Sequence, residues 1–218
     1  MSRKNPTYIQ KQKTFRVIPE KLLSQSKNLL NPISHLLIKY KIGPNTITAL
    51  ALITGLGAGV LFLFGKSFWA GILIIICGIL DTLDGKVAEE SQRKSLYGAQ
   101  LDSTLDRYSE FFIYLGIAYY FREHWALWIT FWTILGSFMV SYTRAKAESL
   151  GIECKIGSMQ RAERLVSLSS AAVIGSLLKI FDIFMIVVLF FIAIVSNITA
   201  MQRILYVRKA EKLIKKGG

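Results

Sequence analysis

The sequence predicts an all-α integral membrane protein, in which six transmembrane helices follow an N-terminal amphipathic helix lying in the membrane interface. Hydrophobic residues make up 52% of the 218-residue chain, a share that a water-soluble domain of this size rarely tolerates. They gather in long runs, and the lysines and arginines lie almost entirely between these runs. We therefore expect the apolar residues to face lipid.

The apolar runs are long enough to cross a bilayer, because about 20 helical residues span the hydrocarbon layer. In the first run, Gly55, Gly57 and Gly59 form a stripe of small residues that permits the close approach of a neighbouring helix. The six predicted spans are residues 46–64, 67–88, 99–121, 125–147, 162–179 and 182–205.

The segment from Ile18 to Lys39 has a different pattern from the spans. It mixes pairs of leucines with lysines, which is typical of a helix lying on the surface of a leaflet. The chain is thus expected to comprise a cytoplasmic segment with this helix (1–45), a six-helix transmembrane domain that carries the site (46–207), and a basic cytoplasmic tail (208–218).

The basic residues predict the orientation. The chain has 27 lysines and arginines against 14 acidic residues, a net charge of +13. All but four of the basic residues fall in the termini and in two loops, 86–97 and 143–164. The positive-inside rule places these segments in the cytoplasm, in a multi-pass protein of the inner (cell) membrane. The same distribution argues against nucleic-acid binding, which needs one exposed basic face, and favours contact with anionic membrane lipids.

Four aspartates lie where the second and third spans meet the cytoplasmic side. Asp81 and Asp84 are spaced i, i+3, and Asp102 and Asp106 are spaced i, i+4, so each pair occupies one helix face. The short 89–97 loop makes the two helices antiparallel neighbours, so the four carboxylates are expected to converge on one pocket. Carboxylates at membrane depth need compensation, and hard oxygen ligands favour Mg²⁺ or Mn²⁺. We expect two such ions.

Small residues flank these acids. Gly85 follows the first pair, Ala88 lies one turn on, and Gly98 precedes the second pair. Without bulky side chains there, a nucleotide or diphosphate is able to approach the backbone. The alternative for the acids is a proton relay or ion pathway, and the alternative for the glycines alone is helix packing.

The spacing of these residues resembles the signature of the CDP-alcohol phosphatidyltransferase family, as does Pro44-Asn45-x-x-Thr48 ahead of the first span. The resemblance covers most of the chain and implies transfer from a CDP-linked lipid with release of CMP, in a homodimer. It implies that the four aspartates ligate metal and that Asp106 is also the general base. The implied nucleotide-binding residues are Asn45, Thr48, Asp81, Asp84, Gly85, Ala88, Gly98 and Asp102.

The acceptor is indicated by two basic segments, 141–148 and 160–164. They resemble the phosphatidylinositol-phosphate and archaetidylinositol-phosphate synthase branch, in which inositol phosphate is the acceptor. The resemblance implies that Arg144, Arg164 and Arg203 bind the phosphate of this polyol phosphate, a role that suits guanidinium groups. Glycerol-3-phosphate also carries a phosphate that the same arginines would bind, so a phosphatidylglycerophosphate synthase is the alternative. The family usually has arginine where this chain has Glu89.

Two other function classes fit the sequence less well. An ion or proton transporter should carry ionisable groups toward the outer halves of its spans, and these are nearly devoid of them here. A non-catalytic scaffold would leave four costly aspartates unexplained. The phosphotransferase hypothesis accounts for the acids, the glycines and the arginines together.

Overall fold

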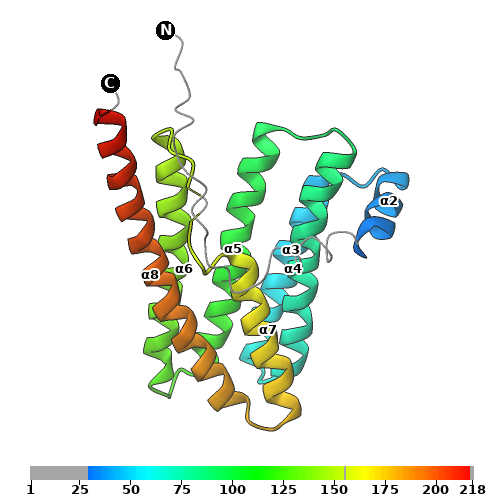
Figure 1. Ribbon diagram of the computed structural model, residues 1–218. Coiled ribbons are helices and arrows are strands. Elements are labelled where there is room, and N and C mark those ends of the chain that lie inside the picture. The colour runs from blue at the N-terminus through cyan, green and yellow to red at the C-terminus, as the bar shows by residue number, and fades with distance from the viewer. Residues whose placement is uncertain (1–28, 155, 217–218) are drawn as a thin grey trace.

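The fold is all-α, as predicted. The computed structural model describes residues 29–154 and 156–216, and every regular element in this part of the chain is a helix (Figure 1). The first part of the predicted amphipathic segment, through residue 28, lies outside the described residues. The helices are α2 (Asn31–Lys39), α3 (Pro44–Leu63), α4 (Ser67–Glu90), α5 (Leu96–Tyr120), α6 (Ala126–Ser149), α7 (Arg161–Leu177) and α8 (Phe181–Lys216).

Four of these helices, α3, α4, α6 and α8, are long and apolar enough to cross a membrane by length and composition. Helix α5 has 25 residues, but it carries Asp102, Asp106, Arg107 and Glu110. Helix α7 has only 17 residues, because the segment before it descends from the end of α6 into the bundle before the helix begins (Figure 1). Each predicted span coincides with one of the helices α3 to α8, and a count of six membrane crossings stays a prediction.

The last helix is longer than the predicted span. Helix α8 has 36 residues and continues through the basic tail to Lys216. At about 1.5 Å per residue, a helix of this length measures about 54 Å, well beyond the hydrocarbon thickness of about 30 Å. Positive side chains stabilise the C-terminal turns of a helix, so the basic tail is able to continue the helix.

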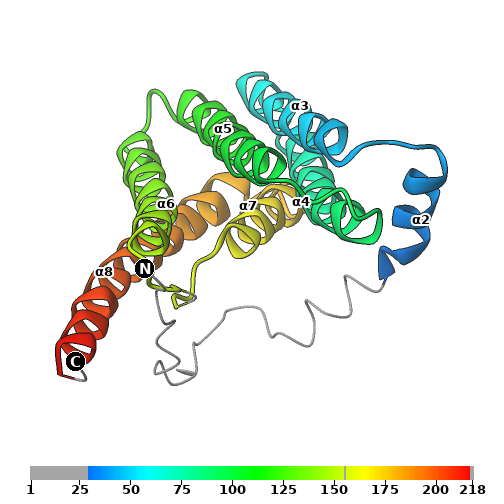
Figure 2. The ribbon, with the colours of Figure 1, turned by 90° about the horizontal axis from the view of Figure 1, so that it is seen from above.

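The helices pack in two groups joined through α7. Helix α3 packs against α4 and α5, and α6 packs against α8, while α7 contacts both α4 and α8 (Figure 2). The buried core runs through both groups, with Phe62, Ile74, Tyr114, Leu168 and Met185 fully enclosed. Helix α7 is therefore placed to bring its first residues between the two groups.

Glycines set the close contact between α3 and α5. A Cβ atom at Gly116 would lie 2.2 Å from the carbonyl oxygen of Gly59, and one at Gly59 would lie 2.3 Å from the carbonyl oxygen of Phe112. Gly55 meets Ser109 in the same way, whereas Gly57 faces the Leu73 side chain on α4. Two of the three glycines in the predicted stripe thus allow the backbones of α3 and α5 to touch.

Helix α2 lies beside the C-terminal end of α4. Its residues Leu37 and Ile38 pack on a small apolar cluster that includes Leu83 and Val87 of α4. Its other side leaves Leu36 about half exposed. A helix with one packed side and one exposed apolar side is suited to the membrane interface, and its contact with a membrane surface stays a prediction.

Candidate active site

Three aspartates from two helices form a compact carboxylate cluster. Asp81 of α4 and Asp102 and Asp106 of α5 each offer an oxygen atom, and these atoms all lie within 4.8 Å of one another. All three side chains are partly buried. The short turn after Glu90 makes α4 and α5 antiparallel, and Asp81 lies nine residues before that turn, about 13 Å along the helix axis. The cluster therefore lies inside the bundle rather than at its rim.

Asp84, the fourth predicted ligand, points to a different partner. Its side chain is 4% exposed, and its Oδ2 accepts a hydrogen bond of 2.8 Å from the hydroxyl of Thr48. Its Oδ1 accepts one from the backbone N–H of Gly85 at 2.5 Å. The structure thus brings three of the four carboxylates into the cluster, and the fourth lies beside Asp102 while it is hydrogen-bonded to the first turns of α3.

The predicted nucleotide-binding residues lie around this junction. Asn45, in the first turn of α3, approaches Gly98 so closely that a Cβ there would lie 3.4 Å from the asparagine Oδ1. Gly85 is exposed, and a Cβ built on it would meet nothing within 4 Å. Ala88 lies one turn further along α4 and is partly buried. Gly85 thus leaves open space beside the acids, whereas Gly98 lets α5 pack against α3.

Arg161, the first residue of α7, is the site residue that the sequence analysis missed. Its Nη1 forms ion pairs with Asp81 and, at 3.0 Å, with Asp106. Its Nη2 donates a hydrogen bond of 2.9 Å to the hydroxyl of Ser109. One feature of the sequence could have indicated Arg161. It lies three residues before Arg164 in the same basic segment, and this spacing puts both arginines on one helix face.

The site fits a divalent cation. The Oδ1 of Asp102 is buried without a hydrogen-bond partner among the described residues. The Arg161 Nη1 lies at ion-pair distance from two carboxylates, yet its N–H groups are not aligned for hydrogen bonds to them. Three carboxylates carry a formal charge of −3 against one guanidinium. Oxygen ligands in this number are those that Mg²⁺ and Mn²⁺ take in proteins.

The three arginines predicted to bind the acceptor phosphate have different surroundings. Arg164 is 1% exposed and forms a bidentate ion pair with Glu110, at 2.5 and 2.7 Å. Arg203 is 2% exposed and donates to the carbonyl oxygens of Ile156 and Val140. Arg144 is exposed and pairs with Glu148 one turn along α6, at 2.9 Å. In this conformation, Arg164 and Arg203 join helices and loops, and Arg144 faces solvent.

Glu89 does not place an uncompensated negative charge beside the site. Lys94, from the turn between α4 and α5, lies 2.9 Å from its carboxylate, and both side chains are largely exposed. The charge reversal relative to the family pattern is therefore balanced within the same turn.

Comparison with known proteins identifies close similarities over most of the chain. The sequence profile described as CDP-alcohol phosphatidyltransferase matches residues 41–204, a range that contains every predicted site residue. An archaetidylinositol phosphate synthase from Pyrococcus horikoshii is 34% identical over 195 residues, covering 87% of this chain and 96% of that protein. A phosphatidylinositol phosphate synthase from Streptomyces avermitilis is 32% identical over 192 residues, covering 83% of this chain and 78% of that protein.

The fold is similar to that of a solved enzyme. The crystal structure of phosphatidylinositol phosphate synthase from Mycobacterium tuberculosis with CDP-DAG bound superposes with a TM-score of 0.75 at 26% identity, covering 83% of this chain and 94% of that chain. The same enzyme in complex with manganese and citrate gives a TM-score of 0.74 at 27% identity, covering 81% and 87%. These solved structures thus share both the fold and a recognisable part of the sequence with this chain.

Proposed function

This chain belongs to the CDP-alcohol phosphatidyltransferase family and is a membrane enzyme of phospholipid biosynthesis, and we propose that its acceptor is inositol phosphate. In this proposal, the phosphatidyl-type group of CDP-diacylglycerol or CDP-archaeol passes to a hydroxyl of the acceptor, and CMP is released. The observation that carries the proposal is the carboxylate cluster of Asp81, Asp102 and Asp106 with the Arg161 guanidinium inserted into it.

The carboxylates have separate roles in the proposed reaction. Asp81, Asp102 and Asp106 would hold one or two divalent cations, with Asp84 beside them on α4. When bound, such cations neutralise the negative charge of the diphosphate and of the departing CMP. A crystal structure of the Mycobacterium tuberculosis relative in complex with manganese supports this choice of metal. Asp106 takes the proton of the acceptor hydroxyl as the hydroxyl oxygen attacks the phosphorus atom.

Gly85 and Thr48 are proposed to shape the binding site for the CDP-linked donor. The open space at Gly85 lets the cytidine diphosphate group lie against the backbone of α4. The Thr48 hydroxyl fixes the Asp84 carboxylate at 2.8 Å, so that Asp84 keeps one orientation. Asn45, Ala88 and Gly98 border the same region and complete the proposed nucleotide-binding set.

Arg161 is proposed to be the residue that meets the acceptor phosphate nearest the reacting atoms. Its guanidinium already lies 3.0 Å from the proposed base, Asp106. Once cations neutralise the carboxylates, this group becomes available to bind a phosphate dianion. Arg144, which is exposed at the end of α6, is proposed to bind the same phosphate from the other side. Direct contacts from Arg164 and Arg203 stay a prediction, and their present partners favour a role in positioning α7 and α8.

The relatives favour inositol phosphate over glycerol-3-phosphate. The similar proteins from Pyrococcus horikoshii and Streptomyces avermitilis are both named as inositol phosphate-type synthases, although their lipids differ. The proposed assembly is a homodimer in the inner membrane, with the termini and active site facing the cytoplasm. The proposed orientation rests on the positive-inside distribution of the basic residues.

The test is CMP release by the purified protein in detergent. With Mg²⁺ or Mn²⁺ and CDP-diacylglycerol or CDP-archaeol, inositol phosphate should support CMP release, and inositol without phosphate should not. Release should cease when EDTA removes the metal. If only glycerol-3-phosphate supports release, the acceptor assignment is wrong and the family activity stands. If no polyol phosphate supports release with either donor, the proposed function is wrong.

A further inference from the structure

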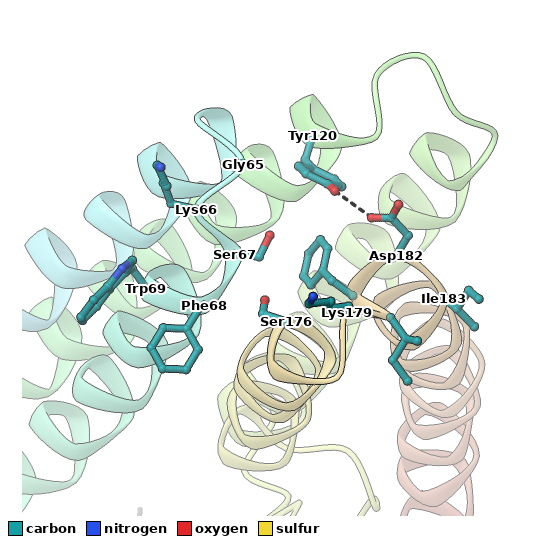
Figure 3. A pocket seen from close by; sticks show the side chains of 12 residues that line it. Gly65, Lys66, Ser67, Phe68, Trp69, Tyr120, Ser176, Lys179, Asp182 and Ile183 are labelled. Carbon is teal, nitrogen blue, oxygen red and sulfur yellow. Dashed lines mark hydrogen bonds between the residues drawn. The ribbon is translucent and has the colours of Figure 1, made fainter.

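A cavity lies at the end of the bundle opposite the carboxylate cluster. It has a volume of about 570 Å³ and is formed where α3 turns into α4, α5 ends, and α7 turns into α8 (Figure 3). Asp81 lies 14 residues from Ser67, about 21 Å along the axis of α4, so the two sites are separate. The proposed transfer reaction makes no use of this cavity.

Two serine hydroxyl groups line the cavity. Ser67, the first residue of α4, lines the cavity and is 6% exposed. The Ser176 Oγ is fully buried and lacks a partner in the described part of the chain. The two side chains lie on facing helices and point into the space between them (Figure 3). A buried hydroxyl without a partner is costly, so the Ser176 hydroxyl is suited to donate to a ligand, with the Ser67 hydroxyl beside it.

The charges around these hydroxyls favour an anion. Lys66 and Lys179 line the cavity; the Lys179 ammonium lies beside the Ser176 side chain, whereas the Lys66 side chain extends from the rim away from the two serines (Figure 3). Asp182, the acidic residue of the cavity lining, accepts a hydrogen bond of 2.7 Å from the Tyr120 hydroxyl. Helices α4 and α8 both begin at this cavity, and the residue preceding α4 caps it with no side-chain hydrogen bond. Helices α3, α5 and α7 end at the same cavity, so the helix dipoles largely offset one another and the ammonium groups carry the positive charge.

The walls of the cavity favour a lipid over a free ion. Phe68, Trp69 and Ile183 line it, and Trp69 and Ile183 are 60% and 68% exposed. The cavity therefore opens onto the apolar flanks of two helices that are long and apolar enough to cross a membrane. A phosphate with two acyl chains would place its charge among the lysines and its chains along these flanks, whereas inorganic phosphate would use only the polar half.

We propose that this cavity binds the phosphate group of an anionic phospholipid from the leaflet opposite the active site. The ammonium groups of Lys66 and Lys179 and the hydroxyls of Ser67 and Ser176 contact the phosphate oxygens. Trp69 and Ile183 flank the start of the acyl chains. The site goes beyond the proposed function, because it takes neither the CDP-linked donor nor the polyol phosphate.

The proposal is tested by lipid binding to the full-length protein in detergent. Short-chain phosphatidylglycerol is titrated while the intrinsic tryptophan fluorescence and the unfolding temperature are followed. The Lys66→Gln/Lys179→Gln variant should bind phosphatidylglycerol at least ten-fold more weakly than the unchanged protein. Arg122→Gln is the matched control, because Arg122 lies at the same end but outside the cavity lining, and it should leave the affinity unchanged.

Further titrations distinguish a phospholipid phosphate from free inorganic phosphate as the ligand. Phosphatidylcholine should bind more weakly than phosphatidylglycerol, and inorganic phosphate at millimolar concentration should not compete. Equal affinity for phosphatidylcholine, or an unchanged phosphatidylglycerol affinity in the double lysine variant, overturns the proposal. Competition by inorganic phosphate that is lost in the same variant also overturns it and identifies a free-anion site. CMP release with saturating donor should be unchanged in the double variant, which keeps this test independent of the proposed transfer reaction.

Discussion

Replacing Glu110 by glutamine should destabilise the protein strongly, although Glu110 is outside the carboxylate cluster. Glu110 and Arg164 are 5% and 1% exposed, and two hydrogen bonds of 2.5 and 2.7 Å join them. The Glu110→Gln variant keeps the shape of the side chain but leaves the Arg164 charge buried without its counter-ion. Removing one partner of a buried ion pair costs about 3–5 kcal/mol, so we expect a loss of this size in the free energy of unfolding.

The assay is equilibrium unfolding in mixed micelles, by titration with a denaturing detergent. The double variant Glu110→Gln/Arg164→Met removes the stranded charge as well and should recover most of the loss, since apolar replacement of a whole buried pair is often neutral. The control is Glu123→Gln, whose side chain is 85% exposed and which should change stability by less than about 0.5 kcal/mol. A loss below about 1 kcal/mol in Glu110→Gln, the value of an exposed pair, would refute the reasoning.

Three further predictions concern the site and the helix packing. Asp102→Asn should abolish CMP release while the unfolding temperature is kept or raised, because it removes a metal ligand and relieves repulsion among the acids; unchanged release would remove Asp102 from the mechanism. Arg161→Gln should tighten Mn²⁺ binding several-fold by calorimetry and raise the KM for the acceptor; an unchanged Mn²⁺ affinity would contradict competition between the guanidinium and the metal. Gly59→Ala should cost about 1–3 kcal/mol of stability, since its Cβ would lie 2.3 Å from the Phe112 oxygen, whereas Gly78→Ala, with its nearest contact at 3.7 Å, should cost less.

The sequence predicted what depends on local pattern. The apolar runs located α3 to α8, because the length and hydrophobicity of a run are properties of consecutive residues. The i, i+4 spacing of Asp102 and Asp106 predicted their shared face, and the short loop predicted that α4 would bring Asp81 to it. Helix geometry thus predicted a carboxylate cluster, which the structure forms from three of the four acids, with Asp84 hydrogen-bonded to Thr48.

Contacts made by α7 could not be predicted in the same way. The place of Arg161 depends on how far the segment after Leu150 descends before α7 begins, and no residue pattern in that segment fixes its path. Arg164 lies only one helical turn after Arg161 on α7, yet it forms its ion pair with Glu110 and not with the aspartates. Which arginine reaches the site is decided by the packing of α7 between α4 and α8, a property of the tertiary structure.

The Arg161 guanidinium stabilises the carboxylate cluster when no metal is bound. Three carboxylates in a bundle of apolar helices repel one another, and a single guanidinium offsets part of their charge. The formal charge that remains, −2, equals the charge that one divalent cation would neutralise. The Arg161 Nη2 is held by the Ser109 hydroxyl, whereas Nη1 makes ion pairs that are not aligned as hydrogen bonds, so the contact of the guanidinium with the acids is mainly electrostatic. In the proposed reaction, a bound cation and the acceptor phosphate would both change the surroundings of this side chain, so the Arg161→Gln variant should alter metal binding and acceptor binding together.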